Sequence, residues 1–410
     1  MRIVVVGAGP AGTTLSLLLA RHGADVCLLE REPAVGSAFR GEGLLPLGLD
    51  ALQQMGLGAA LRGVPGRVVT RWRIYIDGEE VLTVPEPVTE LGERAFRIVS
   101  PAALLDRVIR AAGEFPNFSF HADTRFTDVV RSDDGRVAGV RAVTGGATVE
   151  WPADLVVGCD GRGSSVRTHG GLALQRAAEG YDVLWFKVPA PATLRERCEF
   201  LIMVRARCHP IVAYLSWDDR LQCGVIMPKG GLAEFRHEGW LRAALASAPA
   251  WLAEHVIAHG NNATAPVRLN VVVGRAPSWS APGLLLLGDA AHPMSPVRAQ
   301  GINLALRDVI VAANHVVPLV AGGDMSALDA ACRAIQAERE PEVRRAQQLQ
   351  RRESRGQGDA RAATWRYAVA KRGAALLGRH PWAQRAWLRR QHELRFGSTQ
   401  ITLRVPSAFA

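Results

Sequence analysis

The 410-residue sequence lacks several patterns by which common protein classes are recognised. No stretch approaches the roughly 18 uninterrupted apolar residues of a membrane-spanning helix. The six cysteines form no Cys-x-x-Cys pair, which argues against a disulfide framework or a zinc site. The first apolar run starts at Ile3 and leaves no room for a secretory signal peptide, so we expect a cytoplasmic protein.

Hydrolase and metalloprotease motifs are also missing. No Gly-x-Ser-x-Gly or Ser-His-Asp pattern stands out, and His255 and His259 are not part of a His-Glu-x-x-His motif. We therefore predict no metal site. His292 is expected to satisfy nearby backbone groups rather than to act as a base.

Lysine is scarce, since only Lys187, Lys229 and Lys371 occur, and the net charge of +10 comes from arginine. This excess is interpreted either as a solvated surface or, in part, as arginines that pair with a dinucleotide. The basic residues are not interleaved with aromatic ones, so we predict no nucleic-acid binding. With 48% hydrophobic and 21% charged residues, the chain should fold throughout, into two or three units.

Three apolar runs lead directly into glycine turns: Arg2–Val6 into Gly7-Ala8-Gly9-Pro10-Ala11-Gly12, Asp154–Val157 into Gly158-Cys159-Asp160-Gly161, and Leu284–Leu287 into Gly288-Asp289-Ala290-Ala291. Such continuous apolar runs are typical of parallel strands covered on both faces. After the first turn, a helix over 11–21 and a strand over 24–29 complete the opening of a βαβ unit.

The first turn has the spacing of a dinucleotide-binding loop. Gly7 permits the tight turn, Gly9 lets the backbone approach a pyrophosphate, and Gly12 lets the helix pack closely on the strand. Glu30, at the end of the next strand, can accept hydrogen bonds from a ribose. The turn alone does not distinguish FAD from NAD.

Between the second and third turns, strand-like runs over 181–188, 199–205, 211–216 and 221–227 predict an inserted antiparallel sheet. We assign 1–75, 95–178 and 266–325 to a discontinuous nucleotide-binding domain. The inserted domain takes 76–94 and 179–265, and 326–410 forms a C-terminal helical region. Breaks are expected there at Pro341 and Pro381.

The three turns, in this order, resemble the fingerprints of single-component FAD monooxygenases of the para-hydroxybenzoate hydroxylase type (class A). Further similar segments are Phe39-Arg40-Gly41-Glu42, Val183-Leu184-Trp185-Phe186, Gln222-Cys223-Gly224, Pro228-Lys229-Gly230-Gly231 and Gln300-Gly301-Ile302-Asn303-Leu304-Ala305 to Asp308. The resemblance implies an α/β fold: a glutathione-reductase-type FAD-binding Rossmann domain with an inserted antiparallel β-sheet substrate domain and C-terminal helices.

The same resemblance implies the chemistry. NAD(P)H, bound transiently, would reduce FAD, and O2 would form a flavin C4a-hydroperoxide that oxygenates an aromatic or heteroaromatic small molecule. Baeyer-Villiger oxidation and epoxidation use the same adduct and stay open. A flavin-dependent reductase or oxidase, a non-catalytic FAD-binding protein and a halogenase also stay open, although the Trp-x-Trp motif of halogenases is missing. The protein is expected as a monomer or homodimer.

Site residues follow from the resemblance position by position. The cofactor would contact Gly7, Gly9, Pro10, Ala11, Gly12, Glu30, Arg31, Arg40, Asp160, Gly161, Gly288, Asp289, Pro296, Gln300, Gly301, Ile302 and Asn303. Inward residues of the inserted sheet would contact the substrate: Trp185, Phe200, Met203, Tyr214 and Met227. Backbone N–H groups around Gln300 and Gly301 would stabilise negative charge on the reduced flavin.

Two positions depart from the family pattern. The helix after Val99 usually begins with an arginine or glutamine, but here Ser100 is predicted as its N-cap and Pro101 as its first residue. The loop that usually reads Pro-x-Gly-Gly-Gln-Gly is Pro296-Val297-Arg298-Ala299-Gln300-Gly301. We name Pro296, Arg298 and Gln300 as catalytic candidates. Arg298 either shapes the substrate pocket or points into solvent.

Residues 361–395 alternate arginines with apolar residues: Trp365, Tyr367, Leu376, Leu377, Trp382, Trp387 and Leu388. The pattern favours an amphipathic helix pair packed on the body of the protein. Peripheral contact with a membrane surface is the alternative.

Overall fold

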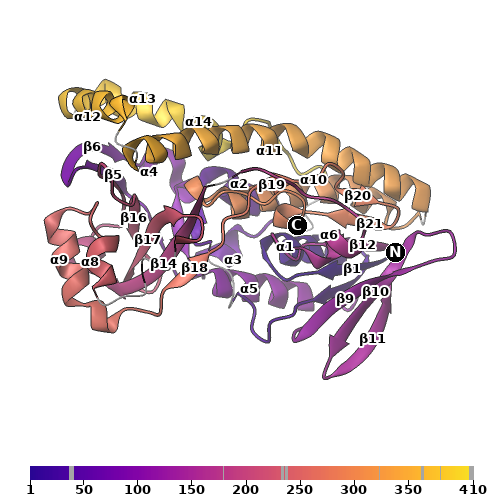
Figure 1. Cartoon of the computed structure of the whole chain (residues 1–410). Helices are drawn as coiled ribbons and strands as arrows, with labels where there is room; N and C mark the ends of the chain where they lie inside the picture. The colour runs from indigo at the N-terminus through magenta and orange to yellow at the C-terminus, as the bar shows by residue number, and fades with distance from the viewer. Residues whose placement is uncertain are drawn as a thin grey trace.

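The two largest sheets of the chain lie side by side, with one long helix along both of them (Figure 1). The computed structural model describes residues 1–36, 41–178, 180–231, 235, 239–322, 324–361, 364–378 and 380–405. The nucleotide-binding sheet, the inserted sheet and the C-terminal helices are its three main parts.

The first sheet has six strands in the order β20-β21-β12-β1-β2-β8. Its members are β20 (Ser280–Ala281), β21 (Leu284–Leu286), β12 (Leu155–Gly158), β1 (Arg2–Val6), β2 (Asp25–Leu29) and β8 (Phe118–His121). Strands β1, β12 and β21 are parallel neighbours, so the three glycine turns that follow them meet at one edge of the sheet. In open α/β sheets the carboxyl edge is where ligands bind.

Apolar helices cover this sheet: α1 (Pro10–Arg21), α5 (Pro101–Gly113) and α10 (Gln300–Val316). The predicted cap of α5 is confirmed, because Ser100 Oγ accepts a hydrogen bond from Ala103 N at 3.3 Å. One stretch among the described residues, Val297–Leu319, is long and apolar enough to cross a membrane, but 72% of its most apolar window is buried inside the protein. We interpret it as the central helix of the core.

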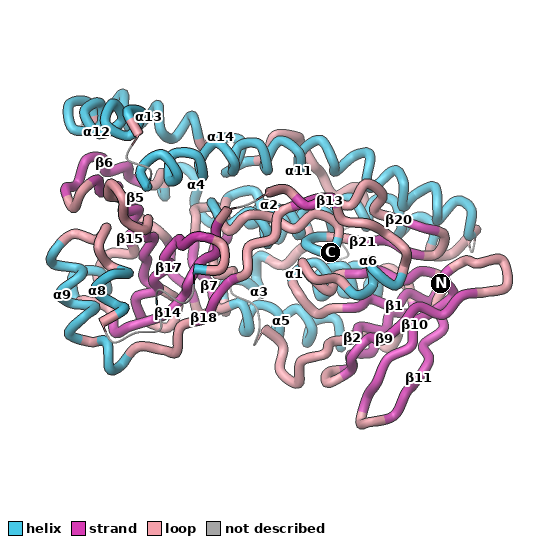
Figure 2. Tube along the Cα trace, viewed as in Figure 1, coloured by secondary structure: helices cyan, strands magenta, loops and turns pink. Residues whose placement is uncertain are grey.

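The second sheet has seven strands in the order β18-β14-β17-β16-β15-β5-β6. Its members are β18 (Val267–Leu269), β14 (Tyr181–Pro189), β17 (Arg220–Pro228), β16 (Ile211–Leu215), β15 (Glu199–Val204), β5 (Arg71–Ile76) and β6 (Glu79–Pro85). Figure 2 shows these strands between α8 (Trp240–Ala244) and α9 (Ala250–Ala258) on one side and the rest of the chain on the other. The inserted sheet is thus confirmed, with the four predicted runs as strands.

The domain boundaries need two corrections. Strand β5 begins at Arg71 and belongs to the second sheet, although residues up to 75 were assigned to the nucleotide-binding domain. Strand β18 pairs with β14 and extends the inserted domain to Leu269 rather than to 265. The pairings of β5 with β15 and of β18 with β14 join segments distant in the sequence and could not be inferred from local residues. The hairpin of β5 with β6 was missed, although only Asp77-Gly78 separates the two strands.

Several smaller elements were not predicted. A sheet of β9 (Thr124–Arg131), β10 (Val137–Thr144) and β11 (Ala147–Pro152) projects from the nucleotide-binding domain, and β3 (Gly43–Leu44), β7 (Arg97–Val99) and β4 (Gly66–Val68) form another. The remaining short elements are α2 (Pro46–Gln54), α3 (Gly58–Arg62), α4 (Val88–Leu91), α6 (Ser165–His169), β13 (Gln175–Arg176), α7 (Ala192–Arg195) and β19 (Gly274–Arg275).

The C-terminal region is helical, as predicted: α11 (Met325–Arg361), α12 (Trp365–Leu377), α13 (Pro381–Arg390) and α14 (His392–Phe396). Pro381 begins α13, but the break expected at Pro341 is wrong, because α11 continues through it. Proline removes one backbone hydrogen bond there. On either side of it, Arg339 and Glu342 are held by buried ion pairs, which keep the helix in place.

These ion pairs tie α11 to α10. Arg339 Nε lies 2.8 Å from Asp308 Oδ1, and Arg307 Nη2 lies 2.9 Å from Glu342 Oε1, with all four side chains buried. Arg339 also contacts Glu342. Burial alone would raise the pKa of Asp308, but His292 and Arg339 hold that pKa below its ordinary value. The network is therefore fully charged and mutually compensated.

Replacing Arg339 by Leu should destabilise the protein by about 3–5 kcal/mol, because Asp308 loses one of its cationic partners and Glu342 is left with Arg307 alone. Urea unfolding in excess FAD measures the change. Arg344→Leu is the matched control on the same helix, since Arg344 forms an exposed pair with Glu340 and should cost at most about 0.5 kcal/mol. Equal effects of the two variants would refute the role of the buried network.

Candidate active site

The three glycines of the first turn have different surroundings. A Cβ on Gly7, whose φ is +103°, would lie 2.5 Å from the carbonyl oxygen of Cys159, and a Cβ on Gly12 would lie 1.9 Å from the carbonyl oxygen of Gly7. Gly7 and Gly12 must therefore be glycines to avoid collisions within the protein, whether or not a ligand is bound. A Cβ on Gly9 would meet nothing within 4 Å. Gly9 therefore borders open space, which is what the close approach of a ligand requires.

The start of α1 faces that space. Gly9 is the N-cap of α1 and makes no side-chain capping bond, and Pro10 is the first helical residue. The first-turn N–H groups, including those of Ala11 and Gly12, thus remain available for an anion at the positive end of the helix. The turn fits a pyrophosphate.

Glu30 is held in place at the end of β2. Its carboxylate accepts hydrogen bonds from Ala8 N at 2.7 Å and from Glu32 N at 3.0 Å. This fixes an acceptor next to the turn, where a ribose would lie. Arg31 is exposed and pairs with Glu32 at 3.1 Å. Arg40, the remaining candidate in this region, lies outside the described residues.

Asp160 organises its own loop. Its carboxylate accepts from the hydroxyl of Ser164 and from the backbone N–H groups of Ser165, at 2.7 Å, and Val166, at 3.0 Å. Gly161, with φ +84°, makes the turn. Asp160 therefore caps the start of α6, and this loop lies directly under Gly7. Its carboxylate is occupied by its own loop rather than directed only to a ligand.

Asp289 lies in the third turn beside the start of α10. A Cβ on Gly301 would lie 3.7 Å from Asp289 Oδ1, and Gly288 takes φ +58° to make the turn. Burial raises the pKa of Asp289 above its ordinary value, although the nearby Arg162 and His292 act in the opposite direction. His292 is buried, with Nε2 2.6 Å from Asp308 Oδ2, so it binds a carboxylate rather than backbone and is not placed as a free base.

Three predicted residues at the start of α10 support the loop with their side chains. Gln300 Nε2 donates to Arg298 O at 3.0 Å and to Leu394 O at 2.8 Å. Asn303 donates to Gly43 O at 3.1 Å and accepts from Leu45 N at 2.9 Å, and Ile302 is buried in the core. No side chain caps this helix, so the N–H groups of its first turn, next to Pro296 and Gly301, can face a flavin.

Arg298 does not point into solvent, because only 11% of its side chain is exposed. Its guanidinium carbon lies 5.2 Å from the ring centroid of Trp72 and 4.9 Å from that of Trp387, and Nη2 lies 3.0 Å from Glu353 Oε2. Burial lowers the pKa of Arg298, while Glu353 raises it. Arg298 and Ala299 both have positive φ, +60° and +50°, where the family pattern has glycines. The guanidinium is therefore neutralised by Glu353 and lies beside both indoles, which also contact each other at 5.4 Å between ring centroids.

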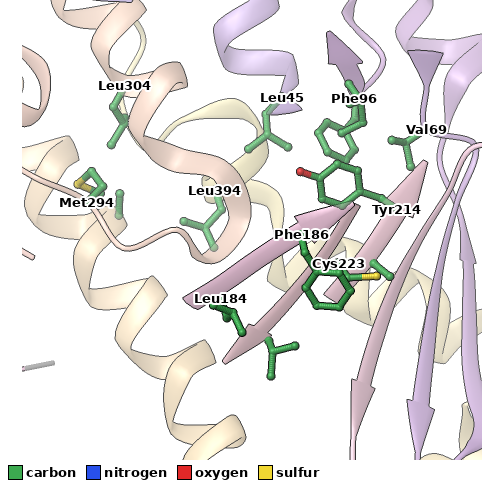
Figure 3. Close-up of a cluster of buried hydrophobic side chains, with 14 of the residues drawn as sticks. Leu45, Val69, Phe96, Leu184, Phe186, Tyr214, Cys223, Met294, Leu304 and Leu394 are labelled. Carbon is green, nitrogen blue, oxygen red and sulfur yellow. The ribbon is translucent and has the colours of Figure 1, made fainter. Parts of the chain in front are cut away.

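The aromatic face of the second sheet lies opposite this loop; we define it by Trp72, Trp185, Phe200 and Tyr214. Its rings form a continuous series: Trp185 to Tyr214 at 6.4 Å, Tyr214 to Phe200 at 5.1 Å and Phe200 to Trp72 at 4.7 Å between centroids. Trp72 in turn stacks on Phe96 at 5.3 Å. Phe96 also lies 6.2 Å from Phe200, and Figure 3 draws Phe96 and Tyr214 in one buried cluster, so this face meets the nucleotide-binding domain.

The prediction that Met203 and Met227 line the substrate region is wrong. Side chains alternate between the two faces of a strand. Met203 is three residues from Phe200 and points to the opposite face, and Met227 pairs with Asp182 on that same opposite face. Both methionines are fully buried in the layer covered by α8 and α9. Phe186 marks this layer, since its ring lies 5.4 Å from that of Trp240.

Tyr214 has the only hydroxyl among the four rings of the aromatic face. Burial raises the pKa of Tyr214 well above its ordinary value. The hydroxyl therefore stays protonated at neutral pH and can donate or accept a hydrogen bond there. Among the described residues, no group of His, Cys, Asp and Glu side chains could hold a metal ion.

Trp72, Phe96, Glu353 and Trp387 were not predicted as site residues. They come from β5, the approach to β7, α11 and α13, and the sequence carries no motif that links them. The alternation of β5 could have indicated Trp72, had the strand been recognised. Trp387 and Glu353 meet Arg298 only through the packing of the C-terminal helices.

The fold and the three turns define a flavoprotein: an FAD-binding Rossmann domain with an inserted sheet over the expected flavin position. Comparison with known proteins agrees. The family model described as FAD binding domain matches residues 1–349. The chain therefore belongs to this family, that of the class A FAD-dependent monooxygenases.

Two curated relatives and one solved structure place it more closely. The chain is 35% identical to 6-methylpretetramide 4-monooxygenase of Streptomyces rimosus, over 99% of this chain and 94% of that protein. It is 32% identical to kynurenine 3-monooxygenase of Salinispora arenicola, over 76% of this chain and 71% of that protein. The structure of p-nitrophenol 4-monooxygenase from Pseudomonas putida matches with a TM-score of 0.75 at 17% identity, covering 97% and 98% of the two chains, and supports the fold.

Replacing Gly9 by Val should weaken FAD binding at least about tenfold without destabilising the apoprotein, because the new side chain meets only the space left for the pyrophosphate. Quenching of flavin fluorescence on titration with apoprotein measures the affinity, and urea unfolding of the apoprotein measures stability. Gly12→Val is the comparison: its side chain collides with the backbone of Gly7, so it should fail in both assays. Unchanged FAD affinity in Gly9→Val would exclude this placement of the cofactor.

Proposed function

We propose that this FAD-dependent monooxygenase uses NAD(P)H and O2 to hydroxylate an extended aromatic compound, held between the aromatic face and the loop at Arg298. The observation that carries the proposal is that the three glycine turns converge at one sheet edge, while Arg298, in the loop after the third turn, contacts Trp72 of the aromatic face. A relative that matches almost end to end is named a monooxygenase of 6-methylpretetramide, and we propose a substrate of the same class.

The length of the aromatic face favours more than one ring. Trp185 and Trp72 lie on β14 and β5, which are separated by three intervening strands. The three steps between neighbouring ring centroids, 6.4, 5.1 and 4.7 Å, limit the whole series to at most about 16 Å. Trp185 and Phe200 are only partly buried, so an aromatic substrate could stack on them and gain about 0.5–1.5 kcal/mol per ring contact beyond its buried area.

The residues of this chain would bind FAD and orient the substrate. Gly9 and the start of α1 hold the pyrophosphate, Glu30 the ribose, and the start of α10 the pyrimidine edge of the flavin. When bound, FAD supplies the transfer of electrons to molecular oxygen. The aromatic face positions the ring to be hydroxylated and keeps water away from it. Tyr214 can hydrogen-bond a phenolic or carbonyl oxygen of the substrate.

The direct test is to incubate the FAD-loaded protein with NADH or NADPH and a panel of multi-ring and single-ring phenols. We expect multi-ring compounds to stimulate coenzyme oxidation more, and label from 18O2 to enter the product. Coenzyme consumption that yields only hydrogen peroxide with every compound would indicate an oxidase and contradict the proposal. Halide-dependent product formation would contradict it as well.

The two faces of β15 provide a matched pair of variants. Phe200→Leu should raise the dissociation constant of the substrate up to about tenfold, because one stacking contact is lost. Met203→Leu changes a side chain of similar volume on the opposite face and should leave that constant unaltered. Equilibrium titration of each FAD-loaded variant gives the values. An equal loss in both would argue for a general effect on folding instead.

Arg298→Gly should lower the fraction of coenzyme oxidation that yields product, while FAD content stays the same. The change removes the guanidinium that lies beside Trp72 and Trp387, and it leaves Glu353 with Arg390 as its remaining ion-pair partner. Product formed per NAD(P)H consumed is the readout. Arg298→Lys keeps the charge but not the planar stacking, and should show an intermediate loss. Unchanged coupling and substrate affinity in both variants would rule out a role for Arg298 in shaping the pocket.

A further inference from the structure

The strongest unexplained surface lies on α12 and α13. Most of the large hydrophobic side chains exposed in the described part of the chain are on these two helices: Trp365, Val369, Leu376, Leu377 and Trp382. Trp365 is 72% exposed and Leu376 is 75% exposed. A concentration of large exposed apolar side chains on two successive helices indicates an interaction site more often than an ordinary surface.

Helical spacing places these residues together. Positions 365, 369, 372 and 376 fall on one side of α12, so Trp365, Val369, Arg372 and Leu376 form a single stripe. On α13, positions 382, 385 and 389 share a side in the same way, with Trp382 flanked by arginines. We call the two stripes together the basic-apolar face.

The opposite sides of the two helices are fixed to the body. Tyr367 donates to Asp77 Oδ1 at 2.7 Å, and Lys371 pairs with the same carboxylate. A Cβ on Gly378 would lie 1.9 Å from the carbonyl oxygen of Val81, so α12 ends in close contact with β6. The predicted packing on the body is therefore observed for one side of α12. The opposite side of this helix carries the exposed stripe of the basic-apolar face.

The positive charge of the basic-apolar face indicates which kind of partner it can bind. Residues 361–392 contain no Asp or Glu, and their Arg and Lys residues are Arg361, Arg366, Lys371, Arg372, Arg379, Arg385, Arg389 and Arg390. A second copy would bring the same cations against this face and be repelled. A partner must be anionic and must also accept tryptophan and leucine side chains.

A further basic feature adjoins α13. A cleft of about 520 Å³ lies between α11 and the α13–α14 corner. Its charged lining residues are Arg345, Arg352, Arg389, Arg390, Glu353 and Glu393, and Leu349, His392 and Leu394 complete the lining. Glu353 pairs with Arg298 and Arg390, and Glu393 pairs with Arg345, so these carboxylates are already compensated. Arg389 belongs to both the cleft and the basic-apolar face, which extends the positive surface.

We propose that the basic-apolar face docks on a lipid bilayer rich in anionic headgroups. Trp and Leu side chains enter the boundary between headgroups and acyl chains, as in interfacial amphipathic helices, and the arginines contact lipid phosphates. Each cation near such a surface contributes about fivefold in affinity at moderate ionic strength. The proposal concerns only this face and does not depend on the substrate.

Sedimentation with sucrose-loaded vesicles tests it, using the FAD-loaded full chain. Vesicles of phosphatidylcholine with about one third phosphatidylglycerol should bind the protein at least about tenfold more tightly than phosphatidylcholine alone, and added salt should weaken that binding. Absence of binding to the anionic vesicles at millimolar lipid would overturn the proposal.

Variants separate the contributions. Trp365→Gln combined with Leu376→Gln should weaken vesicle binding at least about tenfold, and Arg366→Gln with Arg372→Gln roughly thirtyfold. Trp251→Gln, at an exposed tryptophan on α9, is the control and should bind like the parent protein. Equal spectra and FAD content confirm that each variant is folded. If Trp365→Gln with Leu376→Gln instead dissociates a dimer seen by light scattering, the occupant is a second copy and the proposal fails.

Discussion

A single buried carboxylate, that of Asp308, connects the parts on which the flavin site depends. It accepts from Gly288 N at 3.0 Å, contacts His292 Nε2 at 2.6 Å and pairs with Arg339 at 2.8 Å. The third glycine turn, the central helix α10 and the long helix α11 are thereby fixed to one another. A buried charge is tolerated only when it is paired in this complete way. The position of Asp289 beside α10 is a consequence.

Much of the nucleotide-binding half could be predicted from local patterns. A glycine turn after an apolar strand can be recognised from the sequence alone. Gly7 and Gly12 must be glycines because a Cβ at either position would collide with nearby backbone, that of Cys159 and of Gly7 respectively. The cap at Ser100 was predictable for the same reason, since capping involves only the next three residues. Arg40 lies outside the described residues, so its predicted role stays a prediction.

The substrate-binding half was harder to predict from the sequence, because residues that contact one another there are far apart in the chain. Met203 was assigned to the wrong face since a run of apolar residues does not reveal which alternate positions face the flavin. The burial of Arg298 depends on Trp387 and Glu353, which no motif connects to it. The helix continues through Pro341 because tertiary ion pairs outweigh one lost hydrogen bond.

The contact between Trp387 and Arg298 has a consequence for the order in which the protein matures during synthesis. The three glycine turns, with α1 and α10, have all been synthesised once residue 316 has left the ribosome, and Arg339 of α11, the partner of Asp308, follows soon after. The wall beside the aromatic face is incomplete until α13 has emerged and Trp387 has packed against Trp72, at 5.4 Å between ring centroids. A nascent chain can thus acquire the elements for its cofactor before it possesses a closed substrate region.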